Sequence, residues 1–215
     1  MEKKEIFILG VGNNTIVFID LVEACGYKVA GLYHYNNDRT GENVHGYPII
    51  DSNTNLFKEP TLKGKNFAIS VGDNKIRTDL ACKIRKKFGT IPTLIHPTAL
   101  VSRFARIAPG VAINANSVVQ ANVEIGQDTV VSYNVSITHT SHIGCGCYIA
   151  VGSNIGAFVK IQDNVFVGQA ATIVSGKVKY IGSGAIIGAG STVIKNVAPN
   201  TVVAGNPAKK IKTSL

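Results

Sequence analysis

Two histidines lie close together in a part of the chain that carries almost no charge. His139 and His142 fall within residues 130–161, where Lys160 is the only charged side chain. An imidazole titrates near neutral pH, so an exposed histidine can take a proton from an amine or a hydroxyl. The stretch therefore predicts general-base chemistry if the fold presents one of these rings at its surface rather than in the core.

A six-residue repeat decides how these rings are presented. Stepping by six from Val101 meets only Val or Ile at thirteen consecutive positions, ending at Ile173, and after an offset of two the pattern resumes at Ile181. The period fits neither a helix nor a simple alternating strand. Three hexapeptides of this kind make one 18-residue coil of a triangular parallel β-solenoid, and stacked coils share one core. The second half of the chain therefore predicts an all-β solenoid with the aliphatic side chains inside.

A second column of residues supports this prism. Four positions after each aliphatic residue comes a small or β-branched one, from Ala105 to Ala171, which fits a crowded corner. In this frame Ile137 points inward and His139 stands two positions later, on a turn with its ring outward. We expect His142 to be an ordinary surface histidine on a turn, with a catalytic role as the less favoured alternative.

The first ninety residues predict a different, α/β architecture. Residues 6–9 form an apolar run, Gly10 and Gly12 follow, residues 16–22 have a helical apolar face, and 29–33 form the next run. This β-α-β pattern is Rossmann-like, and a glycine turn before a helix can bring amide groups close to a phosphate. A second turn at residues 72–77 follows another strand-like run, and Asp73 can cap the helix after it. The third glycine and the acid of a dinucleotide fingerprint are missing, which disfavours a nicotinamide cofactor.

Composition narrows the classes of partner. The chain has 215 residues and a net charge of +9, and residues 91–215 hold 9 Lys/Arg against 3 Asp/Glu, which favours an anionic ligand. No basic run with interleaved aromatics predicts nucleic-acid binding. The four cysteines fit no zinc framework, and no metal is expected. Without an apolar leader or a membrane span in the sequence, we expect a cytoplasmic protein.

The motifs together resemble a known family. The hexapeptide pattern resembles that of the left-handed β-helix acyltransferases, and its combination with "GVGNNT" and "VGDNKIR" resembles the NeuD-like sugar acetyltransferases, which include the PglD and PerB types. The resemblance implies a homotrimer, acetyl-CoA as co-substrate, and an N-terminal domain that binds the UDP part of a nucleotide-linked amino sugar. It implies domains at 1–92 and 93–197, with a tail at 198–215 that contributes to the coenzyme A site.

The resemblance also assigns residues to roles. "VSITHTSHIG" places the family's catalytic histidine on His139, although Thr140 stands where the family usually has Asp or Glu. The implied sugar-nucleotide contacts are Gly12, Asn13, Asn14, Thr15, His34, Tyr35, Gly72, Asn74 and Arg77. The implied acetyl-CoA contacts are Tyr148, Ala157, Gln169, Ala189 and Lys209.

The expected function is acetyl transfer from acetyl-CoA to the amine of a UDP-linked 4-amino sugar, by direct attack and in bacterial surface-glycan synthesis. Two alternatives stay open. One is O-acetylation of a sialic-acid-type sugar. The other is a non-catalytic β-helix scaffold, which the uncharged Thr140 favours.

Overall fold

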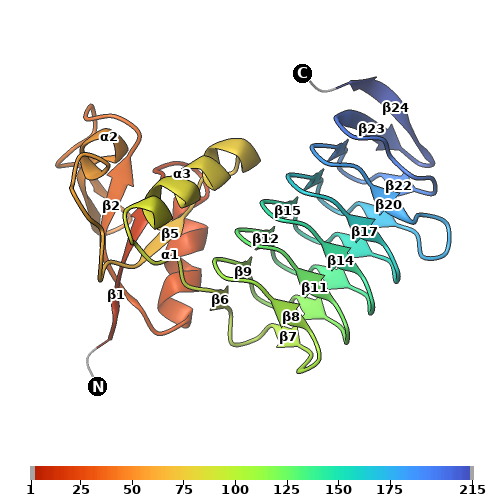
Figure 1. The fold of residues 1–215 in the computed structure, drawn as a ribbon, viewed down its shortest axis with the longest axis horizontal. Helices are drawn as coiled ribbons and strands as arrows, with labels where there is room; N and C mark the ends of the chain where they lie inside the picture. Colours follow the sequence, from red (N-terminus) through yellow and green to blue (C-terminus); the bar gives the residue numbers. More distant parts are fainter. Residues whose placement is uncertain (1–2, 214–215) are drawn as a thin grey trace. The chain divides into compact units, whose positions relative to one another are not determined.

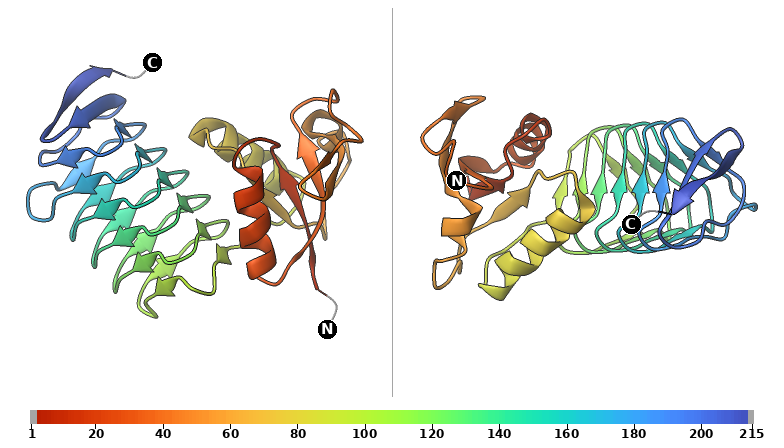
Figure 2. Two further views of the ribbon diagram at one scale, coloured as in Figure 1. Left: turned by 180° about the vertical axis from the view of Figure 1, so that it is seen from behind. Right: turned by 90° about the horizontal axis from the view of Figure 1, so that it is seen from above.

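The computed structural model describes residues 3–213 and divides the chain into two compact units, one up to Leu94 and one from Ile95 onward. Each unit has its own fold, visible in Figures 1 and 2. Among the helices of the described residues, none has the length and apolarity that a membrane crossing requires.

The N-terminal unit is a five-stranded sheet with three helices. The strand order is β3-β4-β2-β1-β5, and every pairing is parallel except that of the short β3 with β4. The strands are β1 (Glu5–Leu9), β2 (Lys28–His34), β3 (Asn43–Val44), β4 (Tyr47–Ser52) and β5 (Phe67–Ile69). The helices are α1 (Thr15–Ala24), α2 (Asn53–Leu56) and α3 (Asn74–Lys86).

Local sequence explains how α3 is held. The side chain of Asp73 accepts a hydrogen bond from the backbone N–H of Ile76 at 2.9 Å, so the predicted helix cap is confirmed. Leu80 and Ile84 on the buried side of the helix join a core cluster with Leu9 and Phe67 of the sheet. The helix therefore packs on the face of β1 and β5 to which Leu9 and Phe67 belong, which places the turn before α3 at the carboxyl end of β5.

The second unit is a parallel β-solenoid whose strands stack into three faces (Figures 1 and 2). The first face is β7 (Leu100–Val101), β10 (Val118–Val119), β13 (Ser136–Ile137), β16 (Asn154–Ile155), β19 (Thr172–Ile173) and β22 (Thr192–Val193). The second face is β8 (Arg106–Ile107), β11 (Glu124–Ile125), β14 (His142–Ile143), β17 (Lys160–Ile161) and β20 (Tyr180–Ile181). The third face is β6 (Leu94–Ile95), β9 (Ala112–Ile113), β12 (Val130–Val131), β15 (Tyr148–Ile149), β18 (Phe166–Val167), β21 (Ile186–Ile187), β23 (Thr201–Gly205) and β24 (Ala208–Thr213). The strands are two residues long except for β23 and β24, and β24 pairs antiparallel with β23.

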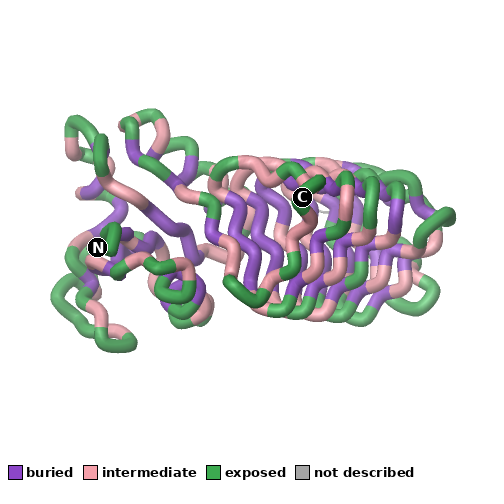
Figure 3. Tube along the Cα trace, turned by 90° about the horizontal axis from the view of Figure 1, so that it is seen from below, coloured by how far each residue is buried: buried purple, intermediate pink, exposed green. Residues whose placement is uncertain are grey.

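The predicted aliphatic column is confirmed as the core of this solenoid. All of its members from Ile113 to Ile173 are buried, and the first two, Val101 and Ile107, pack partly buried against them. In Figure 3 the buried segments follow the coils one above another and exposed segments gather at the corners. The outward residue of each strand pair comes first and the inward residue second.

The predicted small column is also buried from Val111 to Ala171, Ala105 is partly buried, and the polar members of the column have hydrogen-bond partners. The Ser141 hydroxyl donates to the carbonyl oxygen of Gly156 at 2.7 Å, and the Thr129 hydroxyl donates to that of Gly144 at 2.8 Å. Each such bond joins one coil to the next and removes the cost of a buried hydroxyl. Cys147 occupies the same column, fully buried, in the packing role expected from sequence.

The offset in the repeat is a longer corner. Lys160 pairs with Tyr180, a spacing of twenty residues instead of the eighteen that separate Ser136 from Asn154. The extra residues lie in the loop between β19 and β20, at the corner between the first and second faces. His139 lies on this same corner, two coils earlier.

Candidate active site

His139 stands on an exposed turn between β13 and β14. Its ring therefore points away from the core, in the way the repeat predicts. Its backbone N–H donates to the Oε1 atom of Gln120, at 3.1 Å, in the preceding coil. This hydrogen bond holds the turn against the preceding coil and so fixes the position of the His139 backbone.

Thr140 holds one nitrogen of this imidazole. The Nδ1 atom of His139 lies 3.2 Å from Oγ1 of Thr140, within hydrogen-bonding distance. A hydroxyl can accept from a protonated Nδ1, and that tautomer leaves Nε2 unprotonated and able to accept a proton. The residue that replaces the expected acid therefore keeps the hydrogen bond but brings no charge.

Phe158 makes a contact with His139 that our sequence analysis missed. The two ring centroids are 5.3 Å apart with an interplanar angle of 90°, an edge-to-face arrangement. Phe158 is 66% exposed, so the contact lies at the surface. The coil length gave a usable signal: residue 157 follows His139 by eighteen, so residue 158 had to lie beside it.

Ala157, predicted to line the acetyl-CoA site, is on the same corner as His139. Its backbone N–H donates to Oγ of Ser175 at 2.8 Å, in the longer corner loop. The alanine side chain is buried, while Ser175 is exposed. Ser175 is a second residue that sequence reasoning missed, although it follows Ala157 by eighteen positions, the length of one regular coil.

His142 is not on a turn, and this prediction was wrong. It is the outward residue of β14, half-buried, with Nδ1 3.3 Å from Oε2 of Glu124 on the neighbouring strand β11. Glu124 also forms an ion pair with Arg106 at 2.9 Å. The six-residue register places an outward side chain directly before each inward one, so His142 belongs to the second face and not to the corner of His139.

The two glycine-containing turns of the N-terminal unit lie side by side. The hydroxyl of Ser70, after β5, donates to the carbonyl oxygen of Gly10, after β1, at 2.7 Å. Gly10 has a φ of 100°, and a Cβ there would lie 2.8 Å from Cγ2 of Val71, so only glycine fits. A Cβ on Gly72 would meet the Asn14 amide nitrogen at 3.2 Å. The structure thus brings the predicted contacts Asn14 and Gly72 together at the carboxyl edge of the sheet.

The other predicted residues of the first turn differ in their access to solvent. Asn13 is exposed, and at Gly12 a Cβ would have no neighbour within 4 Å. Thr15 is fully buried, and its hydroxyl accepts from the Gly12 N–H at 2.8 Å and donates to Gly10 O at 3.2 Å. Thr15 therefore shapes the turn from inside, while Asn13 and Gly12 border open space.

Arg77 is buried, although its charge suggests an exposed side chain. Its Nη1 donates to the carbonyl oxygens of Val71 and Gly72, both at 3.3 Å, and its Nη2 donates to Oδ1 of Asn74 at 2.8 Å. The guanidinium therefore stabilises the second turn through these three hydrogen bonds. One of the acceptors, Asn74, is itself a predicted contact.

His34 is the last residue of β2, and Tyr35, which follows it, differs from it in exposure. His34 is buried, with Nδ1 3.3 Å from the carbonyl oxygen of Asn36, whereas Tyr35 is 68% exposed. Their ring centroids are 4.3 Å apart. An exposed aromatic ring at the carboxyl end of β2 is available for stacking on a planar group.

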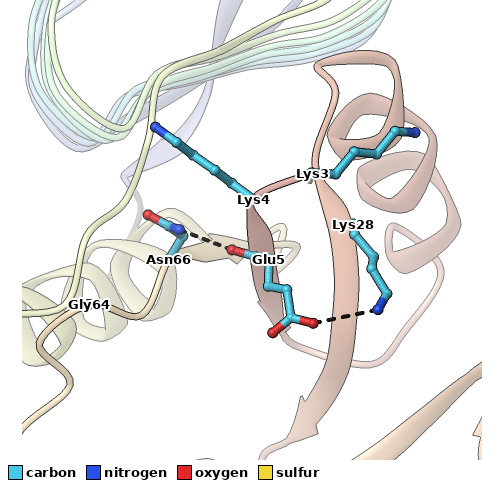
Figure 4. Close-up of a pocket in the computed structure, with 6 residues that line it drawn as sticks. All are labelled: Lys3, Lys4, Glu5, Lys28, Gly64 and Asn66. Atoms are coloured by element: carbon cyan, nitrogen blue, oxygen red, sulfur yellow. Dashed lines mark hydrogen bonds and ion pairs between the residues drawn. The ribbon is translucent and has the colours of Figure 1, made fainter. Parts of the chain in front are cut away.

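A separate cavity opens at the other end of the strands, lined by Lys3, Lys4, Glu5, Lys28, Gly64 and Asn66 (Figure 4). Its volume is about 680 Å³. These residues begin or precede β1, β2 and β5, so the cavity is at the amino edge of the sheet, away from the two turns. Glu5 is 3.6 Å from Lys28, which neutralises part of its positive charge.

Comparison with known proteins places the chain in a family. Residues 5–84 match the family described as the PglD N-terminal domain. The chain is 30% identical over 208 residues to GDP-perosamine N-acetyltransferase of Escherichia coli O157:H7, with 94% of this chain and 93% of that protein covered. The chain belongs to the NeuD/PglD/PerB-like sugar acetyltransferases.

Solved structures agree with this assignment. The acetyltransferase domain of PglB from Neisseria gonorrhoeae FA1090 superposes with a TM-score of 0.87 at 26% identity, covering 97% of this chain and all of that one. A mutant of perosamine N-acetyltransferase from Caulobacter crescentus, in complex with CoA and GDP-perosamine, has a TM-score of 0.72 at 26% identity, with 97% of each chain covered. This NeuD/PglD/PerB-like protein is thus an acetyltransferase with a left-handed β-helix.

In this family member, the predicted acetyl-CoA contacts do not share one corner. Ala157 lies with His139 between the first and second faces, whereas Gln169 and Ala189 are exposed between the third and first faces. Tyr148 is on the third face, stacked on Phe166 at 5.7 Å, and Lys209 is exposed on β24. One whole face separates the two corners, so a single chain does not gather these residues around one ligand. Among residues 3–213, no group of three or more His, Cys, Asp or Glu is placed to hold a metal ion.

Proposed function

We propose that the protein transfers the acetyl group of acetyl-CoA to the amine of a nucleoside-diphosphate-linked amino sugar, with His139 as the general base. The observation that carries this proposal is the exposed imidazole whose Nδ1 is held by Thr140, leaving Nε2 for the acceptor. Relatives named for GDP-perosamine N-acetylation, one of them in complex with CoA and GDP-perosamine, support the reaction class.

The proposed chemistry is a direct acyl transfer. The neutral amine nitrogen attacks the thioester carbonyl carbon, Nε2 of His139 takes a proton from that nitrogen, and the C–S bond breaks as the amide forms. The coenzyme A thiolate leaves and takes a proton to become the free thiol. A backbone N–H at the same corner can stabilise the oxyanion. The Ala157 N–H is the candidate, and the thioester oxygen would replace the Ser175 hydroxyl as its acceptor.

We propose a division of labour between the units. We propose that the N-terminal unit is Rossmann-like, which the parallel pairing of β1 with β2 and β5 and of β2 with β4 supports, and we assign the nucleotide part of the acceptor to the paired turns. Gly12, Asn13 and Asn14 would contact the phosphates, and Tyr35 would stack on the base. Thr15, His34, Asn74 and Arg77 would support these contacts from within. The family resemblance predicts a UDP-linked acceptor, whereas two of the named relatives are perosamine N-acetyltransferases, one of them in complex with GDP-perosamine. An assay with both nucleotides decides the base.

We also propose that the active protein is a homotrimer. His139 and Ala157 lie on one corner of the prism, and Gln169 and Ala189 lie on another. A neighbouring copy would bring the second corner to the first and complete one acetyl-CoA site between two chains. Light scattering of the purified protein tests this, and a monomer with full activity would contradict it.

The decisive assay for the function follows thiol release from acetyl-CoA. Acceptors are UDP- and GDP-linked 4-amino sugars, with a sialic acid as the hydroxyl-bearing alternative. His139→Ala is expected to lower kcat by about 10²- to 10⁴-fold with acetyl-CoA binding retained. His142→Ala is the matched control, since that ring faces Glu124 on the second face, and it should keep wild-type turnover. Thiol release from none of these acceptors, or unchanged turnover in His139→Ala, would refute the proposal.

A further inference from the structure

The solenoid corners carry a ladder of left-handed backbone positions. Every sixth residue from 116 to 170 has a φ between 53° and 70°. These positions are Asn116, Asn122, Asp128, Asn134, Thr140, Gly146, Gly152, Phe158, Asn164 and Ala170. Asn, Asp and Gly tolerate this region, whereas a β-branched or bulky side chain there is strained. Seven of the ten positions follow this preference and three do not.

Two of the three exceptions touch His139. Thr140, with a φ of 61°, hydrogen-bonds to Nδ1, and Phe158, with a φ of 62°, places its ring edge-to-face on the imidazole. The third exception is Ala170, whose small side chain is the mildest departure. The strained side chains thus coincide with the one exposed histidine of these corners.

Packing within a single chain gives no reason for a phenylalanine at position 158. The side chain is 66% exposed, so it buries little apolar surface, and its backbone is in a region that an asparagine or glycine would occupy without strain. Backbone strain of this kind persists where it serves a site. Among residues 3–213, the aromatic ring that contacts Phe158 is the His139 imidazole.

We propose that Phe158 is a positioning residue for His139. The edge-to-face contact restricts rotation of the imidazole about its Cβ–Cγ bond, while Thr140 holds Nδ1, so Nε2 keeps one direction toward the acceptor. This inference rests on the proposed function of His139 as a base. It predicts that removing the ring weakens catalysis while relieving strain.

The first experiment compares Phe158→Asn with the wild type. The variant should raise Tm by about 2–4 °C, because the strain is released. It should lower kcat by about three- to tenfold with little change in KM for either substrate, because the lost ring contact orients the base and not the ligand. Phe158→Tyr keeps the ring and should retain both wild-type values. A rise in KM with unchanged kcat would mean that Phe158 contacts substrate, and it would overturn the positioning role.

The matched control is Phe88→Asn. Phe88 is 73% exposed with a φ of 65°, in the turn after α3, so the same substitution releases the same kind of strain away from any predicted site residue. It should raise the stability of its own unit and leave kcat unchanged. Equal losses of kcat in the Phe88 and Phe158 variants would refute a specific role for Phe158.

A second measurement needs no acceptor. The ring protons of His139 should show a ring-current shift in the NMR spectrum of the wild type and of Phe158→Tyr, and should lose it in Phe158→Asn. Lost shift with no turnover by the wild type on any acceptor would refute the proposed function and leave the positioning contact standing. An unaltered His139 signal in Phe158→Asn would refute the contact itself.

Discussion

The hydroxyl of Thr140 can be tested with a substitution that changes almost nothing else. Thr140→Val keeps the β-branched shape and the strained backbone, and the backbone N–H still donates to the carbonyl oxygen of Ala121 at 3.0 Å. It removes only Oγ1, which lies 3.2 Å from Nδ1 of His139. A net hydrogen bond of about 1 ± 0.5 kcal/mol corresponds to roughly a two- to tenfold loss of kcat if the bond orients the base.

The assay is the initial rate of thiol release at saturating acetyl-CoA and acceptor. Unfolding in urea should shift by less than about 0.5 kcal/mol, since the side chain is exposed. Thr140→Ser retains a hydroxyl and should recover most of the activity. Equal kcat for Thr140→Val and the wild type would refute the view that this hydroxyl orients His139, as would a serine variant that is folded and as slow as the valine variant.

A carboxylate at position 140 should raise kcat, whereas removal of the hydroxyl should lower it. Aspartate tolerates a positive φ, so Thr140→Asp should relieve strain and place a negative charge beside the imidazole. The charge stabilises the imidazolium that forms as the proton is taken, and kcat should rise above that of the wild type. A decrease in kcat in a folded Thr140→Asp protein would show that an uncharged partner is required here.

Three further predictions concern stability. Ile137→Ala should lower the free energy of unfolding by about 2–5 kcal/mol in a urea titration, because the side chain is fully buried in the solenoid core. Gly156→Ala should cost about 1–3 kcal/mol in the same titration, since a Cβ would lie 2.5 Å from the Ser175 nitrogen and 2.6 Å from the Ile173 oxygen. Burial raises the pKa of Tyr33 from 10.0 to about 12. Its contribution to stability is present below pH 10 and is lost as the pH rises through 12. In Tyr33→Phe, the urea midpoint should therefore fall less between pH 10 and 12 than it does in the wild type. An equal fall in both proteins would contradict a raised pKa for Tyr33.

The solenoid was predictable because its period carries two kinds of information at once. The residue that recurs at Val131 and Ile137 must be inside, and the residue two places later must be at a corner, so the exposure of His139 followed from counting. The same counting was applied incompletely at His142, which precedes an inward isoleucine and is therefore on a face. The error came from placing His142 on the turn that precedes it, although the six-residue register puts it in the strand.

Contacts between coils were harder to foresee. The Phe158 ring reaches His139 from the next coil, and the Ser175 hydroxyl likewise accepts from the Ala157 N–H one coil earlier. The first was hidden in a column of asparagines and glycines that our reasoning did not examine. In the N-terminal unit, the burial of Arg77 could not be derived from the sequence, because it depends on two backbone carbonyls of its own turn that point at the guanidinium.

The longer loop between β19 and β20 shows where this architecture accepts extra chain. Lys160 still pairs with Tyr180, so two added residues left the registry of every later rung intact. A one-residue addition within a face would instead exchange inside for outside in all coils beyond it. Corners are thus the positions at which such a prism can acquire new surface loops, and the edge that bears the imidazole is the one this chain has already extended.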